Sequence, residues 1–229
     1  MNAESPTHLV VAIDGPAGSG KSTVAQRVAQ ALGCALLDTG ALYRTLALVA
    51  REAGVAWDDA PGLGQLAARL QVHFRREGDQ NRAFLGQRDV SREIRTPEIS
   101  AGASQVSALP QVREALLALQ RGVSRQGPLV AEGRDMGTVV FPAAAVKVFL
   151  VARPAERARR RQRELEASGR KVALEQVLDE QTRRDVADST REVAPLKAAV
   201  DAHQVDTTTM TIDQVVQHIL DIVRRQTGP

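Results

Sequence analysis

Eight consecutive residues near the start of the chain form a phosphate-binding pattern. Gly15-Pro16-Ala17-Gly18-Ser19-Gly20-Lys21-Ser22 fits the spacing G-x-x-x-x-G-K-[ST] at every position. Glycines permit positive φ and close approach of the backbone, so successive N–H groups can point inward toward an anion. In this pattern Lys21 supplies a cation to the β- and γ-phosphates, and the Ser22 hydroxyl is a ligand for Mg²⁺. The pattern, with Thr23 following it, predicts a nucleoside triphosphate site.

The residues on either side of this loop agree with the motif. Residues 9–13 are apolar and β-branched, which is typical of a buried strand, and residues 23–32 carry apolar side chains at helical spacing. A strand, a loop and the start of a helix place N–H groups and a partial positive charge against phosphate. The alternative is a glycine-rich turn with a chance lysine, and the agreement of motif and context argues against it.

Strands and helices alternate along most of the chain. Further strands are expected at 34–37, 129–131, 145–151 and 205–209, and helices at 41–53, 97–122 with an interruption at Pro110, 154–188 with a break at Ser168-Gly169, and 211–226. Thr211 and Gln214 have the spacing of a capping box. This order predicts an α/β fold of three layers with a parallel central sheet. The strand ends at Gly15, Asp38 and Glu132 to Asp135 should then meet in one crevice.

One region interrupts the alternation. Residues 58–64 hold turn-forming residues, and 71–76 and 83–90 resemble two short strands. We interpret residues 66–104 as an inserted subdomain.

Composition limits the remaining possibilities. The chain has 229 residues, a formal net charge of +3 and a single cysteine, Cys34. A charge this small does not by itself indicate nucleic acid, and one cysteine forms no internal disulfide. The four histidines lack zinc-ligand spacing, the first eight residues lack the features of a signal peptide, and no apolar run approaches transmembrane length. We expect a cytoplasmic protein without membrane contact.

Arginines distinguish among proteins that carry such a loop. Arg44 and Arg134 follow expected strands, and Arg184 and Arg191 flank Asp188. Transfer between two phosphates would require such arginines, because guanidinium groups grip phosphate oxygens on the acceptor side. The run at 157–163 has two interpretations. It is either a solvated helix face, including a nucleic-acid patch, or a mobile lid that closes over the triphosphate.

The chain resembles the bacterial cytidylate kinases, a family of nucleoside monophosphate kinases. The segment at 133–142, Gly-Arg-Asp-Met-Gly-Thr-Val-Val-Phe-Pro, carries the most specific likeness. Other matching segments are 13–23, 38–44, 91–96, 103–106, 112–116, 184–191 and 193–196.

The resemblance implies an enzyme that transfers the γ-phosphoryl group of ATP to CMP or dCMP, giving CDP or dCDP, with Mg²⁺. It implies a P-loop core at 1–65, 105–152 and 192–229, an inserted acceptor-binding subdomain at 66–104 and a helical lid at 153–191. We expect a monomer that binds no nucleic acid. The implied roles are cytosine binding by Ser104, Arg113 and Asp135, phosphate binding by Arg44, Arg134 and Arg191, ribose binding by Arg184 and Asp188, and acceptor-site positions at Thr39 and Tyr43. Lys21, Arg157 and Arg160 are expected to neutralise charge on the transferred group, and Asp38 is expected to be catalytic.

Some positions leave alternatives open. Glu132 stands where the family usually has Asp, and Thr39 where Ser is common. Asp38 and Glu132 either bind Mg²⁺ through water or have a capping or turn-stabilising role. Tyr43 either contacts the acceptor or is structural with a bonded hydroxyl.

Three other functions fit parts of the pattern. They are a kinase of the same fold acting on UMP, dTMP or a metabolite such as shikimate, a nucleic-acid-binding ATPase, and a regulatory module that holds ATP without turnover. The small net charge, the absence of interleaved aromatics and the intact Lys21 and Ser22 argue against the last two.

Overall fold

The computed structural model describes residues 8–78, 80–167 and 169–228. The expectations for the first seven residues and for Ser168 lie outside this part of the chain.

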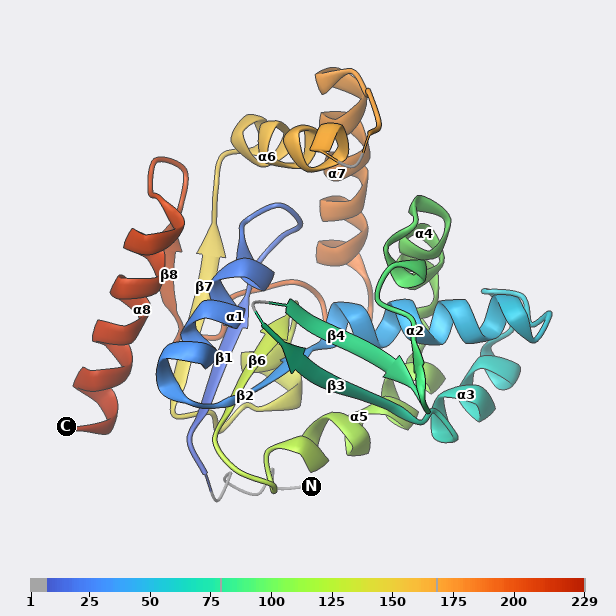
Figure 1. The fold of residues 1–229 in the computed structure, drawn as a ribbon, viewed down its shortest axis with the longest axis horizontal. Helices are drawn as coiled ribbons and strands as arrows, with labels where there is room; N and C mark the ends of the chain where they lie inside the picture. Colours follow the sequence, from blue (N-terminus) through green and yellow to red (C-terminus); the bar gives the residue numbers. More distant parts are fainter. Residues whose placement is uncertain (1–7, 79, 168, 229) are drawn as a thin grey trace.

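A five-stranded parallel sheet forms the centre of the molecule (Figure 1). Its order is β2-β6-β1-β7-β8. The strands are β1 (Val10–Asp14), β2 (Ala35–Asp38), β6 (Leu129–Gly133), β7 (Val146–Val151) and β8 (His203–Asp206). Apolar, β-branched runs form β1 and β7 because strands in a parallel sheet are covered on both faces. The predicted α/β fold with a parallel sheet is confirmed.

Alternating side chains of the strands build two cores. Val11 and Ile13 pack toward helices α1 (Lys21–Leu32) and α8 (Ile212–Thr227), whereas Val10 and Ala12 pack on the other face. That second face is covered by α5 (Pro110–Val123) and by a π-helical turn at Met136–Val140. Because successive strand residues point to opposite faces, one short strand anchors both helical layers. The predicted three layers are therefore present.

The capping box predicted at the last helix is also present. The Thr211 side chain accepts from the backbone N–H of Gln214 at 3.2 Å, and the Gln214 side chain accepts from the N–H of Thr211 at 2.9 Å. These two bonds satisfy orphan donors at the start of α8.

The region between β2 and α5 has its own core. It contains α2 (Thr39–Glu52), α3 (Ala60–Ala68), α4 (Pro97–Val106) and a small antiparallel sheet of β3 (Val72–Glu77), β4 (Gln80–Leu85) and β5 (Arg88–Asp89). Residues of the helices and of the small sheet share one apolar cluster. The boundary of the predicted inserted subdomain at 66–104 stays a prediction.

The expectation of a turn at 58–64 is wrong, because most of that segment belongs to α3. The Asp59 side chain accepts from the N–H of Gly62 at 3.0 Å and caps the helix. Pro61 lies in the first turn, where its missing N–H costs nothing. Residues typical of turns thus form a helix start here.

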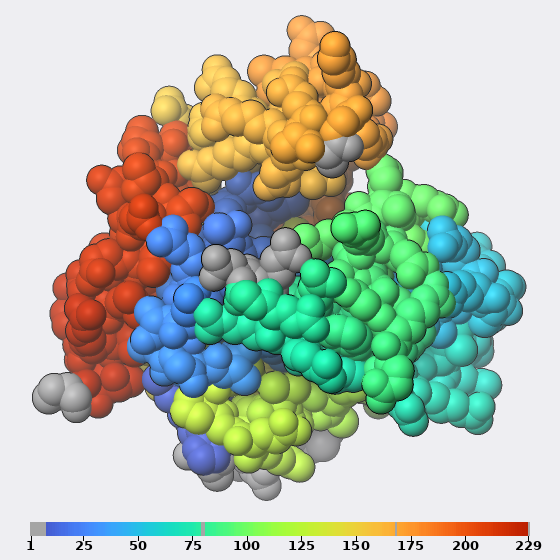
Figure 2. Space-filling model, in the orientation of Figure 1, coloured from blue at the N-terminus to red at the C-terminus, as the bar shows by residue number. Residues whose placement is uncertain are grey.

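Helices α6 (Pro154–Ala167) and α7 (Leu174–Thr190) lie beyond the carboxyl ends of the strands (Figure 1). They share a small core of Ala158, Leu165 and Val177. Figure 2 shows the surface hollowed beneath these orange helices, with blue N-terminal residues at the back of the hollow. The helical arrangement fits the predicted lid, whose limits and movement stay predictions.

The packing of α4 against α2 leads to a stability prediction. A Cβ on Gly102 would lie 2.4 Å from Cε2 of Trp57, and the Trp57 indole N–H donates to the Ala47 carbonyl at 3.0 Å, which fixes the ring. Gly102→Ala should therefore lower the free energy of unfolding by about 1–3 kcal/mol. Gly122→Ala in α5 is the control, because nothing lies within 4 Å of its added Cβ. Urea denaturation should show the control unchanged or up to about 1 kcal/mol more stable, and equal curves for both variants would contradict the prediction.

Candidate active site

The phosphate loop joins β1 to α1 in a conformation that requires glycine. Gly15 and Gly18 have φ of +149° and +75°. A Cβ on Gly15 would lie 2.3 Å from the Leu150 carbonyl oxygen of β7, and one on Gly18 would lie 2.8 Å from the Gln181 amide nitrogen of α7. The loop therefore fits closely between the sheet and α7. The buried Ser19 hydroxyl has no hydrogen-bond partner among the described residues, which leaves it for a ligand.

Lys21 is buried at the start of α1, where its Nζ donates to the Pro16 carbonyl at 2.8 Å. Burial, with Arg134 and Arg184 nearby, lowers the pKa of Lys21 to about 7, although Glu132 opposes the shift. A bound polyphosphate would favour the charged ammonium, because an adjacent anion raises the pKa of a lysine.

The end of β6 connects the loop to the second helix. The Ser22 hydroxyl donates to Oε1 of Glu132 at 2.6 Å, and the Thr39 hydroxyl donates to the Glu132 carbonyl at 2.8 Å. Asp38 caps α2 by accepting from the N–H of Ala41 at 2.7 Å, so its expected capping role is present. Burial beside Asp38 raises the pKa of Glu132 to about 7.

These oxygens fit Mg²⁺ as a ligand set. The ion takes one or two carboxylates together with phosphate oxygens and water, and Ser22, Asp38 and Glu132 offer a hydroxyl and two carboxylates at one sheet edge. Within the described ranges there is no group of three or more His, Cys, Asp or Glu residues that could hold a metal by itself. A metal here would therefore depend on the nucleotide.

A buried carboxylate surrounded by two arginines forms the opposite part of the site. Asp135 pairs with Arg113, and Arg191 Nη2 lies 3.8 Å from Asp135 Oδ1. The Arg113 guanidinium also lies 5.7 Å from the centre of the Tyr43 ring. Burial raises the pKa of Tyr43. Tyr43 therefore adjoins this cluster through its ring, and the choice between an acceptor contact and a structural role stays open.

Three further arginines lie between these two groups. Arg134 Nε bonds Asp188 at 2.8 Å, and Arg44 lies 3.5 Å from Asp38. Burial and the charge of Arg134 lower the pKa of Arg184 to about 10. Burial opposes ionisation of Asp188, but Arg134 and Arg184 outweigh it and the pKa of Asp188 is lowered. Arg184 Nε, Arg44 Nε and Arg191 Nη2 are buried without hydrogen-bond partners in the described structure. They remain available to anionic oxygens.

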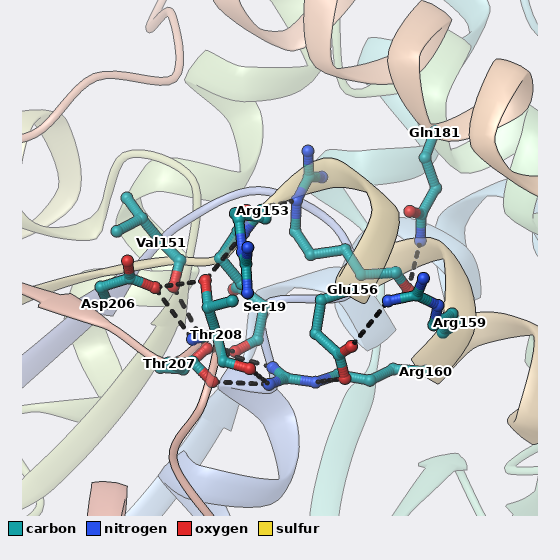
Figure 3. A network of polar contacts seen from close by, with 12 residues as sticks. Ser19, Val151, Arg153, Glu156, Arg159, Arg160, Gln181, Asp206, Thr207 and Thr208 are labelled. Atoms are coloured by element: carbon teal, nitrogen blue, oxygen red, sulfur yellow. Dashed lines mark hydrogen bonds and ion pairs between the residues drawn. The ribbon is translucent and has the colours of Figure 1, made fainter.

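The two arginines predicted to lie on the lid have different surroundings. Arg157 is buried, bonds Asp185 at 2.7 Å and donates to the Ala17 carbonyl of the phosphate loop at 3.0 Å. Arg160 points toward the loop after β8, where it donates to the Thr207 carbonyl at 2.6 Å (Figure 3). Thr207 Oγ1 lies 3.2 Å from the Ser19 carbonyl. Arg157 therefore touches the loop directly, whereas Arg160 reaches it through Thr207.

The structure brings most of the predicted residues to one sheet edge. Ser104 lies on α4 one turn before Ser107, whose carbonyl accepts from Arg113 at 3.0 Å. Among the described residues, the Ser104 hydroxyl makes no hydrogen bond to the cluster. Sequence reasoning missed Asp14, Gln181, Asp185 and Thr207. Asp14 and Asp185 stand inside matching segments, which was the available signal, whereas nothing local distinguishes Gln181 or Thr207. The roles of all these residues stay predictions.

A parallel sheet, a phosphate loop at its carboxyl edge and a facing set of buried arginines define a P-loop phosphotransferase.

Comparison with known proteins gives the family. A family model described as "Cytidylate kinase" matches residues 11–225. The cytidylate kinase of Syntrophotalea carbinolica is 51% identical over 94% of this chain and 92% of its own. That of Vibrio cholerae is 48% identical over 97% of this chain and 98% of its own. The chain belongs to the cytidylate kinase family, so the predicted resemblance and the predicted kinase activity are confirmed.

Solved structures of other kinases are more distant. The gluconokinase from Sinorhizobium meliloti is 15% identical, with a TM-score of 0.47 over 98% of this chain and 97% of its own. In the described part of this chain, none of the helices has the length and apolar character needed to cross a membrane.

The raised pKa of Glu132 predicts a pH effect on stability. The folded protein retains the Glu132 proton up to about pH 7, whereas an unfolded chain releases it near pH 4.5. The folded state then binds more protons in this window, so Glu132 contributes stability that falls as pH rises from 4.5 to 7. Relative to wild type, Glu132→Gln should become progressively more stable over that range.

Chemical denaturation of the nucleotide-free protein at several pH values measures this difference. Glu114→Gln, at an exposed position of α5, is the control and should track wild type. A pH-independent gap between Glu132→Gln and wild type would contradict the assignment.

Proposed function

We propose that this protein transfers the γ-phosphoryl group of ATP in line to the 5′-phosphate of CMP or dCMP, giving CDP or dCDP. One observation carries the proposal. The buried Asp135 carboxylate lies between Arg113 and Arg191, at the same sheet edge as Lys21. Such a cluster offers hydrogen-bond donors and an acceptor to a nucleobase bound beside the polyphosphate site. Family membership supports the same substrates.

Cytosine recognition follows from hydrogen-bond polarity. Cytosine has an N4 amino donor and N3 and O2 acceptors, so Asp135 accepts from N4 while Arg113 and the Ser104 hydroxyl donate to the acceptors. Uracil has an oxygen at position 4, which would face a carboxylate. Sites built on buried hydrogen bonds reject analogues of the wrong polarity strongly.

The arginines hold the acceptor phosphate and ribose. Arg44, Arg134 and Arg191 bind the phosphate, and their buried guanidinium nitrogens without partners support this role for Arg44 and Arg191. Asp188 accepts from ribose hydroxyls, with Arg184 beside it. Thr39 and Tyr43 line the site from α2.

Charge stabilisation replaces a general base, because the acceptor oxygen is already anionic near neutral pH. Lys21 and the lid arginines Arg157 and Arg160 offset charge on the phosphoryl group. Ser22, with Asp38 and Glu132 through water, would hold Mg²⁺, which would supply additional positive charge to the phosphate oxygens. The loop from Gly15 to Thr23 binds ATP through its backbone N–H groups.

Water exclusion depends on the parts that flank the cleft. Residues 66–104 form the acceptor-binding subdomain, residues 153–191 form the lid, and both close over bound nucleotides. The Arg157 contacts with Asp185 and Ala17 support a lid whose position is coupled to the phosphate loop. The protein acts as a monomer, with no nucleic acid and no membrane partner.

An acceptor panel with ATP and Mg²⁺ tests the function and the base contact together. Wild type should phosphorylate CMP and dCMP, with UMP, dTMP and shikimate far behind. In Asp135→Asn the amide presents donors as well as an acceptor, so the preference for CMP over UMP in kcat/KM should fall by at least about 100-fold. A coupled assay measures both values. An unchanged preference would refute the Asp135 contact, and a wild type inactive on CMP would refute the function.

Removal of one acceptor-side arginine tests the phosphate site. Arg191→Ala should lower kcat/KM for CMP by about 10²–10³-fold, because an arginine aimed at transferring phosphate stabilises the transition state. Arg183→Ala, an exposed arginine of α7, is the control and should retain wild-type turnover. Steady-state kinetics with circular dichroism to verify folding gives the comparison. Near-wild-type turnover in Arg191→Ala would remove Arg191 from the acceptor site.

A further inference from the structure

Asp14 is a buried carboxylate to which the proposed chemistry gives no role. It is the last residue of β1 and immediately precedes Gly15 of the phosphate loop. Its side chain is only 4% exposed. Its Oδ1 accepts from the backbone N–H of Met136 at 2.8 Å, and its Oδ2 accepts from the N–H of Gly137 at 2.8 Å. Each oxygen thus holds one donor of a segment 122 or 123 residues away in sequence.

The turn that follows β6 needs this carboxylate. Within it, Val140 N–H donates to the Asp135 carbonyl at 3.1 Å and Phe141 N–H to the Met136 carbonyl at 2.7 Å. The first N–H groups of a helical segment have no partners inside it. Asp14 accepts from two of them, and a negative charge there also complements the positive end of the turn.

Gly137 lies between Asp14 and Lys147. A Cβ at Gly137 would lie 3.3 Å from Lys147 Cδ, a tight contact, and 3.5 Å from Asp14 Oδ2, an ordinary one, so the turn is enclosed from both sides. The position of the turn is therefore fixed from the β1 side by hydrogen bonds and from the β7 side by packing.

The same turn carries the residues that read the acceptor. Arg134 and Asp135 come directly before Met136, while the phosphate loop comes directly after Asp14. A shift of the turn would move Asp135 relative to the phosphate loop, and misplacement by about 1 Å can slow a reaction by about 100-fold.

We propose that Asp14 is a positioning residue that fixes the cytosine-reading turn relative to the phosphate loop, and thereby sets both in-line alignment and base discrimination. The inference rests on the proposed function. It extends that function by assigning control of specificity to a residue whose two carboxylate oxygens bond the backbone of the turn.

Asp14→Asn is the sharpest test. An asparagine of the same shape offers one acceptor oxygen, so one of the two N–H groups at Met136 and Gly137 loses its partner. We expect kcat for CMP to fall by about 100-fold and the CMP-to-UMP ratio in kcat/KM by about tenfold. The KM for ATP should stay within about twofold, because the loop itself keeps its contacts.

Lys147→Met is the matched control. Lys147 Nζ donates to the Pro142 carbonyl at 2.5 Å and bonds Asp201 at 2.7 Å, and its stem packs on Gly137. Methionine keeps the apolar stem and loses the polar contacts. This variant should lose stability and keep the CMP-to-UMP ratio.

The outcomes separate a positioning role from a structural one. A lower CMP-to-UMP ratio in Asp14→Asn alone supports the inference. An unchanged ratio and kcat in Asp14→Asn, or an equal change of the ratio in both variants, overturns it. If Asp14→Asn does not fold, Asp14→Glu, which keeps both oxygens on a longer side chain, undergoes the same measurement with the same criteria.

Amide hydrogen exchange on the nucleotide-free wild type gives a second test, which does not require any variant to fold. The amides of Met136 and Gly137 should be among the most protected, and fast exchange at both would overturn the inference. A wild type that fails to phosphorylate CMP overturns this inference together with the proposed function. An active wild type with an unaffected Asp14→Asn overturns only the inference.

Discussion

The site depends on keeping like charges buried close together before any ligand neutralises them. Burial and neighbouring arginines lower the pKa of Lys21 and of Arg184, and burial likewise lowers that of Arg191. The charged form of each group is therefore destabilised where it lies, and a nearby anion would stabilise it. Two carboxylates, Asp135 and Asp188, neutralise part of this positive charge. The phosphates of two nucleotides would neutralise the remainder, so nucleotide binding would also balance the charge of the site.

The fold brings these charged residues together from several rigid elements at the carboxyl edge of the sheet. β1 and β6 are adjacent, with Asp14 paired to Gly133 in the register, so the phosphate loop and the segment with Arg134 leave the sheet side by side. Helix α7 then contributes Asp188, which fixes the Arg134 guanidinium from another element. Because the cations come from different elements, no single loop has to fold against its own charge repulsion. The phosphate loop is likewise held by a separate element, because Gly18 fits closely against Gln181 of α7.

Local patterns predicted what depends on local physics. The glycine-lysine loop, the apolar strands β1 and β7 and the capping box at Thr211 each follow from spacing and lie where the sequence placed them to within one residue. The last strand, expected at 205–209, instead runs His203–Asp206. The failure at 58–64 shows the limit, since Asp59 and Pro61 serve equally for a turn or a helix start and packing decides between them. The partners of Asp14 and Arg157 come from residues far apart in the chain. Their pairing depends on the tertiary fold, so no spacing rule could have given it.

Glu132 links the starts of two helices to the central sheet. The Glu132 carboxylate accepts from the Ser22 hydroxyl at 2.6 Å, while its backbone carbonyl accepts from the Thr39 hydroxyl at 2.8 Å. One residue of β6 therefore bonds the first turns of both α1 and α2. A shorter carboxylate would have to leave Ser22 or draw α1 closer to the sheet. The Glu132 side chain thus couples the Ser22 hydroxyl to β6, and any movement of the phosphate loop that carries Ser22 along must also move or break that bond.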